Sequence, residues 1–341
     1  MMSWYHTPGK DHDVVISTRV QLARNIADCA FVAHMKPSDA ESIIRKVGAV
    51  LENGGFHRID VSNVSRAQAH AMVEQQYAGP SFIKVSLPHA LYLNEPCHLS
   101  VMLCEEEHIR IQCILPGASP EEAWEGVRRV DELLDASFVY AYDKSGKWGY
   151  LTQNPRRIGT GLLVSSTLFL PALTSNGRIS SLASNLSHNG FSIREAANHS
   201  LLSRGYLYQI SNRISVGLSE NEILHRLKRA VAFLCEEERA ARTTLPKNRL
   251  EALTNRIWRS WGILKYAYAL PLGEFISLLS DVRLGVALGI LDQVQMHEIT
   301  TLFIEGLPAT LTASLESQDG IPDKLDAARG ALIRKKLKEA R

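Results

Sequence analysis

The chain has 341 residues, of which 45% are hydrophobic and 22% are charged, with a formal net charge of +2. This composition is typical of a globular protein long enough for one large domain or two, and so small a charge provides no field to attract nucleic acid or a membrane. No stretch has the length of a membrane span, residues 1–10 hold no signal-peptide core, and the five cysteines are scattered without a CxxC pair. We therefore expect neither a disulfide framework nor a zinc site, and we expect a cytoplasmic location.

The first part of the chain predicts strands interspersed with helices. A buried strand is expected over 13–20, and helical spacing over 38–51 follows Ser38, a candidate N-cap. A second helix is predicted over 120–136, and 192–205 resembles a mobile loop. Further strand-type runs lie at 81–87, 90–93, 99–103, 109–115 and 162–170.

From residue 222 onward the pattern is almost entirely helical. A break at 243–246 separates it into two parts, so we expect a mixed α/β domain over 1–240 and a helical domain over 248–341. A polar linker at 318–324 leads to a basic final helix. Trp258, Trp261 and Tyr268 leave two interpretations open, a dimer face or a buried core stripe.

Residues 104–112 combine a carboxylate cluster with an alternating strand. Glu105, Glu106 and Glu107 run into a segment in which Ile109 and Ile111 face one side and His108, Arg110 and Gln112 face the other. Carboxylates and a guanidinium at one place suit the handling of a cation beside a polyphosphate. A solvated acidic turn before a half-buried strand explains the same residues, so this segment alone leaves both interpretations open.

Four segments, taken together, resemble the ATP:guanido phosphotransferases, and among them the bacterial protein-arginine kinases. They lie, in this order, at 16–25, 105–117, 149–173 and 193–212, and residues 259–264 and 279–285 are similar to that family's C-terminal domain. The resemblance implies an α/β (α+β) catalytic domain with a largely antiparallel sheet flanked by helices, followed by a helical domain. It also implies ATP and Mg²⁺ as cofactors.

The chemistry of this family explains the residue types in these segments. Transfer of a γ-phosphoryl group to a guanidinium needs arginines on the phosphates and carboxylates that orient the acceptor and take its proton. By resemblance, Glu106 holds the guanidinium and acts as base with Glu105 beside it, while Arg19, Arg110 and Arg194 bind phosphates. The positions at which the family binds nucleotide are occupied here by Ser17, Thr18, Arg19, Gln21, Arg110, Leu163, Val164, Ser165 and Arg194.

Several positions depart from the family pattern. Gln21 and Leu163 replace two phosphate-binding arginines, Asn154 replaces a reactive cysteine, and His199 stands where a loop glutamate is expected. Gln76 aligns, less securely, with a nucleotide-contacting histidine. A neutral His199 has a pKa suited to accepting a proton, but a loop residue without catalytic duty is the other interpretation.

Nearby arginines are candidates to compensate for the two that are missing. Arg156 and Arg157 are extra cations in the third segment, and Arg204 lies in the loop. Solvated loop arginines are the alternative interpretation of Arg156 and Arg157. Further on, residues 325–330 match a phosphoarginine-binding motif that lacks its leading arginine, so binding there stays open, and Asp326 and Arg329 also fit a helix-surface ion pair.

Two classes of function follow. The first is ATP-dependent phosphorylation of arginine side chains in client proteins, which the resemblance links to stress response, protein quality control, an AAA+ (Clp-type) unfoldase and a zinc-finger activator. Whether such an enzyme forms a homodimer stays open. The second is an inactive pseudokinase that binds arginine, phosphoarginine or a partner, which the substitutions at Gln21, Leu163, Asn154 and His199 favour. A kinase for a free guanidino metabolite is a weaker third interpretation, because the match begins at Asp13 without an N-terminal helical domain.

Overall fold

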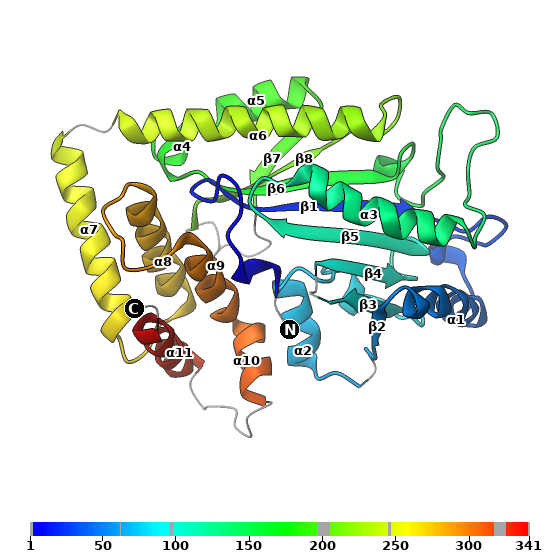
Figure 1. The fold of residues 1–341 in the computed structure, drawn as a ribbon, viewed down its shortest axis with the longest axis horizontal. Coiled ribbons are helices and arrows are strands. Elements are labelled where there is room, and N and C mark those ends of the chain that lie inside the picture. The colour runs from blue at the N-terminus through cyan, green and yellow to red at the C-terminus, as the bar shows by residue number, and fades with distance from the viewer. Residues whose placement is uncertain are drawn as a thin grey trace.

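The computed structural model describes residues 3–61, 63–95, 98–196, 205–244, 247–316 and 325–339 (Figure 1). Its centre is one 8-stranded sheet in the order β2-β3-β4-β5-β1-β6-β8-β7, and every neighbouring pair is antiparallel. The predicted largely antiparallel sheet is thereby confirmed. The strands are β1 (Val15–Arg24), β2 (Phe56–Ile59), β3 (Ala90–Asn94), β4 (Leu99–Leu103), β5 (Ile109–Pro116), β6 (Leu162–Phe169), β7 (Phe191–Glu195) and β8 (Leu207–Asn212).

Helices cover one face of this sheet, and α3 and α6 run beside it in Figure 1. Their apolar sides pack on strand residues such as Val20, Ile111 and Val164 to form the main hydrophobic core. Because successive strand residues point to opposite faces, the intervening polar side chains lie on the other face, where the candidate site forms. The helices of this layer are α1 (Pro37–Asn53), α3 (Pro120–Asp135), α4 (Pro171–Ser175), α5 (Ile179–His188) and α6 (Glu220–Thr243).

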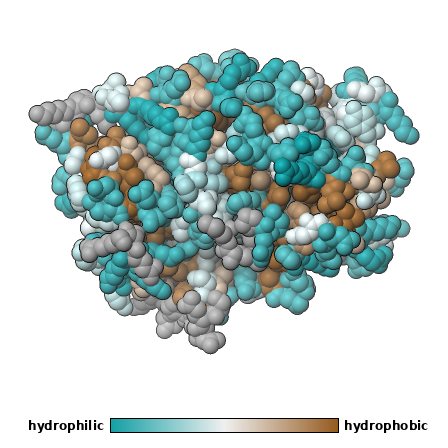
Figure 2. Space-filling model, viewed as in Figure 1, coloured by the Kyte–Doolittle hydropathy of each residue, from teal (hydrophilic) through white to brown (hydrophobic). Residues whose placement is uncertain are grey.

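Most of the remaining helices build a second hydrophobic core around Ile257, Phe275 and Ile333. A third cluster, which includes Trp4, Phe82 and Ile304, joins these helices to the polar side of the sheet. In Figure 2 hydrophilic side chains dominate over α3 and α6, whereas hydrophobic ones show beside α8 and between α1 and α3. The helices of this part are α2 (Arg66–Glu74), α7 (Lys247–Tyr266), α8 (Leu272–Ala287), α9 (Met296–Glu305), α10 (Pro308–Glu316) and α11 (Leu325–Glu339).

Three local predictions were wrong. The run at 81–87 is not a strand: it contains the 3-10 turn η3 (Phe82–Lys84), because Phe82 turns inward and packs edge-on against His89. Ser38 is no N-cap, since Pro37 takes the first helical position, where its missing N–H costs nothing. The loop expected at 192–205 begins as β7, because this segment pairs with β8, and its residues 197–204 lie outside the described ranges.

Two further expectations concern the surface of the described chain. Trp261 is buried, whereas Trp258 and Tyr268 are exposed, so the core-stripe interpretation holds for Trp261 alone. No helix among the described residues is long and apolar enough to cross a membrane.

Candidate active site

Cross-strand pairing gathers most of the predicted nucleotide-binding positions on the polar face of the sheet. Gln21 on β1 lies opposite Gln112 on β5 and opposite Leu163 on β6, and Arg19 lies opposite Ser165. Paired residues share a face, and residues two apart on one strand share it too. The polar face therefore carries a continuous row of side chains across β5, β1 and β6.

The three glutamates lie in the turn between β4 and β5, at one end of this row. Cys104 reverses the chain with a φ of 56°, and its N–H donates to the carbonyl of His108 at 2.9 Å. Glu105 points back along β5, where its Oε2 lies 2.6 Å from Arg110 Nη2. The Ser81 hydroxyl donates to the other oxygen of Glu105. Glu105 therefore positions Arg110, one of the predicted phosphate-binding residues.

Glu107 is fully buried and organises the turn that carries Asn154. Its Oε2 accepts from Asn25 Nδ2 at 2.6 Å and from the Gln153 N–H at 2.9 Å, and its Oε1 accepts from the Asn154 N–H at 3.0 Å. Asn25 also accepts the His108 N–H through Oδ1 at 2.8 Å. Both carboxylate oxygens of Glu107 are thus hydrogen-bonded within the protein, and they join the 104–108 turn to the 152–157 segment.

Glu106 is the glutamate that remains accessible, with a side chain 34% exposed. Asn154 Nδ2 donates to its Oε1 at 2.9 Å. Its Oε2 lies 4.0 Å from Arg110 Nη1 and 3.8 Å from Arg157 Nε. An open carboxylate held by an amide beside guanidinium groups has the geometry needed to receive a cationic substrate group next to bound phosphates.

Four arginines lie near one another on this face: Arg19, Arg110, Arg157 and Arg194. Burial, and then repulsion by the other three, lowers the pKa of Arg19 to about 10. Burial, and then the charge of Arg110, also lowers the pKa of Arg157, against an opposing effect of Glu106. Arg194 is exposed on the edge strand β7. Such a cluster attracts an anion of high charge density.

Several predicted site residues do not join this cluster. Thr18 and Val164 face the opposite side, where the Thr18 hydroxyl donates to the Gly117 carbonyl at 2.7 Å and Val164 enters the core. The Arg156 side chain is exposed. His199 and Arg204 lie outside the described residues.

Two predicted polar residues are used within the protein. Gln76 contributes its carbonyl, which accepts from Gln112 Nε2 at 2.7 Å. His108 turns away from the row: its Nδ1 accepts from the Ile26 N–H at 3.0 Å, and its Nε2 lies 2.9 Å from the Ala30 carbonyl oxygen. Burial lowers the pKa of His108.

Sequence reasoning assigned no positioning role to three residues, Asn25, Ser81 and Gln112. Asn25 fixes Glu107, Ser81 fixes Glu105, and Gln112 accepts from Gln21 Nε2 at 2.7 Å. Asn25 and Gln112 stand inside segments that the family resemblance singles out, which is the signal that identifies them. Ser81 had no such signal, because only the folded chain brings it to Glu105.

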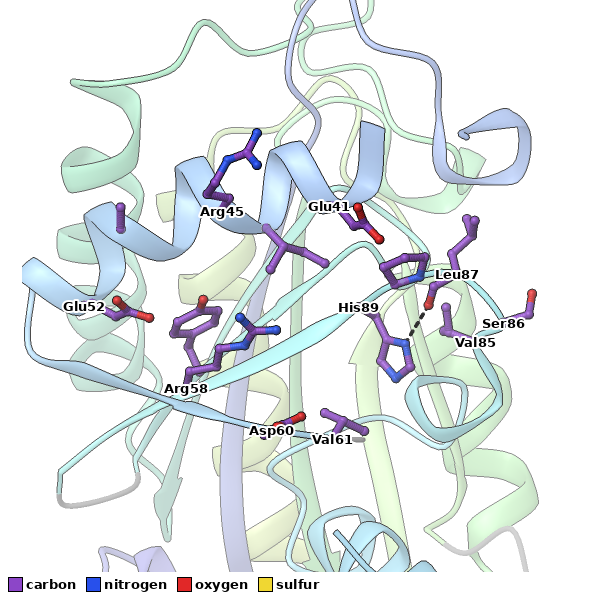
Figure 3. Close-up of a pocket in the computed structure, with 14 residues that line it drawn as sticks. Glu41, Arg45, Glu52, Arg58, Asp60, Val61, Val85, Ser86, Leu87 and His89 are labelled. Carbon is purple, nitrogen blue, oxygen red and sulfur yellow. Dashed lines mark hydrogen bonds between the residues drawn. The ribbon is translucent and has the colours of Figure 1, made fainter. Parts of the chain in front are cut away.

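Among the residues that the structure describes, no group of three or more His, Cys, Asp or Glu side chains is placed to hold a metal ion. A separate pocket lies between α1, β2 and the segment at 85–89 (Figure 3). Its lining includes Glu41, Arg45, Arg58 and His89, and the Nδ1 of His89 lies 2.8 Å from the Leu87 carbonyl oxygen. Its lining contains none of the predicted site residues.

The motif at 325–330 has a structural role in this chain. Arg329 is 1% exposed, and its guanidinium donates to the carbonyls of Gly306 at 2.7 Å and Leu270 at 2.6 Å. Its Nη1 also lies 2.7 Å from Asp326 Oδ1. The expected ion pair therefore exists, but Arg329 is buried rather than on the helix surface.

Comparisons with known proteins agree over nearly the whole chain. A family model described as the ATP:guanido phosphotransferase C-terminal catalytic domain matches residues 40–241, and one described as the protein-arginine kinase McsB C-terminal domain matches 250–341. The chain is 35% identical over 342 residues to a protein-arginine kinase of Brevibacillus brevis and 33% identical over 341 residues to one of Desulforamulus reducens. Each match covers 98% of this chain and 95% of the relative.

Solved structures show the same fold at lower identity. The substrate-free duplicated taurocyamine kinase from Schistosoma mansoni aligns with a TM-score of 0.60 and 19% identity, over 74% of this chain and 39% of that one. Lombricine kinase aligns with a TM-score of 0.59 and 17% identity, over 69% of each chain. At these identities the likeness concerns the fold alone.

Proposed function

The chain belongs to the ATP:guanido phosphotransferase family, and on that premise we propose that it catalyses ATP-dependent phosphorylation of arginine side chains in proteins. The observation that carries this proposal is Glu106, an accessible carboxylate held by Asn154 beside a cluster of arginines. A guanidinium bound to Glu106 would lie next to phosphates bound by Arg19, Arg110 and Arg194. In this proposal Glu106 binds the substrate arginine, and the arginine cluster binds ATP.

The proposed reaction is a single phosphoryl transfer. A guanidinium nitrogen of the substrate arginine attacks the γ-phosphorus, a P–N bond forms, and the bond from the γ-phosphorus to the β,γ-bridging oxygen breaks to release ADP. Glu106 accepts the proton that the nitrogen loses. Arg19 and Arg110 stabilise the charge that spreads over the transferring phosphoryl oxygens.

We propose that Mg²⁺ enters as the complex with ATP, because the described residues offer no cluster that would hold it alone. When bound, it would neutralise phosphate charge and help to orient the triphosphate. Glu105 and Glu107 are not free for a metal, since the first pairs with Arg110 and the second accepts three hydrogen bonds.

Wider roles are proposed on the family relationship. We infer that residues 1–240 act as the catalytic domain and residues 248–341 as a helical domain, in line with the separate family models. Candidate partners are an AAA+ (Clp-type) unfoldase and a zinc-finger activator, and a homodimer is a candidate assembly. A cytoplasmic location fits the free cysteines Cys29, Cys104, Cys113 and Cys235.

The proposal is tested by phosphorus NMR at mildly alkaline pH on protein supplied with MgATP and an arginine-rich protein substrate. We expect a phosphoarginine resonance that Glu106→Gln reduces by about 10²–10⁴-fold, since general-base catalysis contributes that much. Glu122→Gln, an exposed change on α3, is the matched control and retains activity. Full activity in Glu106→Gln would refute its role, and silence of the folded wild type with activator present would point instead to the inactive binding module.

A further inference from the structure

We propose that Arg157 supplies the phosphate-binding cation that Gln21 and Leu163 no longer provide, so that one side chain replaces two and binds the triphosphate of ATP. The inference rests on the proposed function and names a residue of the same site. It is carried by the position of Arg157 on the polar face, by its hydrogen bond to Gln21 and by its unpartnered N–H groups.

The two replaced arginine positions lie at one place in the fold. Gln21 on β1 and Leu163 on β6 are direct partners in the antiparallel register, so side chains from both strands occupy the same patch of the polar face. Arginines at both positions would have shared that patch. With glutamine and leucine there, the patch has room for one guanidinium that arrives from another segment.

Arg157 arrives from the 3-10 turn η4 (Pro155–Arg157) and enters this patch. Its Nη2 donates to Gln21 Oε1 at 3.2 Å, and the side chain is 9% exposed. The neighbouring Arg156 remains in solvent, because consecutive residues of a tight turn point in different directions. Asn154 caps the turn by accepting the Arg156 N–H at 3.0 Å. The residue that replaces the family cysteine thus also helps to direct Arg157 inward.

Gln21 is itself held in place for this contact. Its Nε2 donates to Gln112 Oε1 at 2.7 Å, so its Oε1 remains available for Arg157. An arginine at position 21 could not have accepted this bond. The substitution that removes one cation from β1 therefore creates the acceptor that fixes another.

The guanidinium groups at this place lack partners for part of their N–H donors. Among the described residues, Arg157 Nη1, Arg19 Nε and Arg110 Nε are buried and make no hydrogen bond. Buried donors without partners are costly, and three that belong to neighbouring arginines are explained together by an anion with several oxygen acceptors. Glu106 does not fill this role, because its Oε2 stays 3.8 Å from Arg157 Nε.

The test compares MgATP binding, by isothermal titration calorimetry, in Arg157→Ala and Arg156→Ala. Both variants lose one positive charge within the same turn. We expect Arg157→Ala to bind MgATP about 10- to 100-fold more weakly than the wild type, and Arg156→Ala to bind it equally well. Equal affinity in the two variants would overturn the inference.

A rescue variant separates phosphate binding from a structural role. Leu163→Arg in the Arg157→Ala background returns a cation to the same patch from β6, and we expect it to recover MgATP affinity at least about tenfold. Weak binding that is not rescued, together with a lowered melting temperature of Arg157→Ala, would assign Arg157 to folding and overturn the inference.

Failure of this inference can be told apart from failure of the proposed function. Binding of MgATP that depends on Arg157, without any phosphoarginine from the wild type, would support the inference and refute the function. Phosphoarginine formed equally by the wild type and Arg157→Ala would do the reverse. A wild type that binds no MgATP would refute both.

Discussion

Glu107→Gln is expected to destabilise the fold although it changes one side-chain atom and leaves the side-chain shape unchanged. The carboxylate is fully buried and accepts three hydrogen bonds, from Asn25 and from the N–H groups of Gln153 and Asn154. An amide has one acceptor oxygen, so at least one donor would face an NH₂ group. An unsatisfied buried donor costs about 1–3 kcal/mol, and the remaining bonds lose their ionic partner, so we expect a loss of about 2–4 kcal/mol.

Urea unfolding followed by circular dichroism measures this loss. Hydrogen exchange at the amides of Gln153 and Asn154 localises it, since both should exchange faster in the variant. Glu106→Gln is the matched control: its side chain is 34% exposed, and we expect its stability to stay within about 0.5 kcal/mol of the wild type. Wild-type stability and unchanged exchange in Glu107→Gln would refute the role assigned to this carboxylate.

Two further predictions concern stability. Burial, then Arg283 and His297, lower the pKa of His12 from 6.5 to about 4, against an opposing effect of Asp13, so between these values the unfolded chain binds a proton that the folded chain does not. Stability should therefore fall as pH drops from about 6.5 to about 4, and His12→Gln should lessen that fall in urea unfolding across this range; an unchanged pH profile would contradict it. Arg329→Ala should cost about 3–5 kcal/mol, because buried carbonyls and Asp326 lose their donor, whereas Lys335→Ala on the exposed side of α11 should be neutral in the same assay. Equal stability of these two variants would show that Arg329 is dispensable for the fold.

Sequence patterns predicted those elements whose structure depends on local periodicity. The strands near 90–93 and 99–103 and the helix from Pro120 appeared close to their predicted bounds, because their apolar spacing matches the face that each one buries. The run at 81–87 was mistaken for a strand because its apolar residues belong to a turn. The buried Phe82 of this turn packs against His89 and within the third hydrophobic cluster, and these contacts cannot be read from local periodicity. Ser38 misled because proline at the preceding position competes for the same start of the helix.

In the candidate site, too, the sequence predicted some features and not others. The carboxylates and three of the arginines were recognisable from motifs, but their division of labour was not: Glu105, Glu106 and Glu107 are adjacent in sequence and have three different environments. Each glutamate is held by a residue from a distant segment: Ser81 donates to Glu105, Asn154 to Glu106 and Asn25 to Glu107. These contacts decide which carboxylate pairs with Arg110, which stays open to substrate and which stabilises the turn. Tertiary hydrogen bonds of this kind leave no periodic trace in the chain.

The departures from the family pattern illustrate the point most directly. In the sequence the departures at Gln21, Arg157 and Leu163 appear unrelated, because they are spread over more than a hundred residues. In the sheet, Gln21 and Leu163 are partners, and Arg157 is hydrogen-bonded to the first of them. A count of lost arginines therefore overstates the loss of positive charge at this place, because one guanidinium remains where two were expected. Whether phosphate binding survives depends on the charge held at that patch, rather than on which strand or turn contributes it.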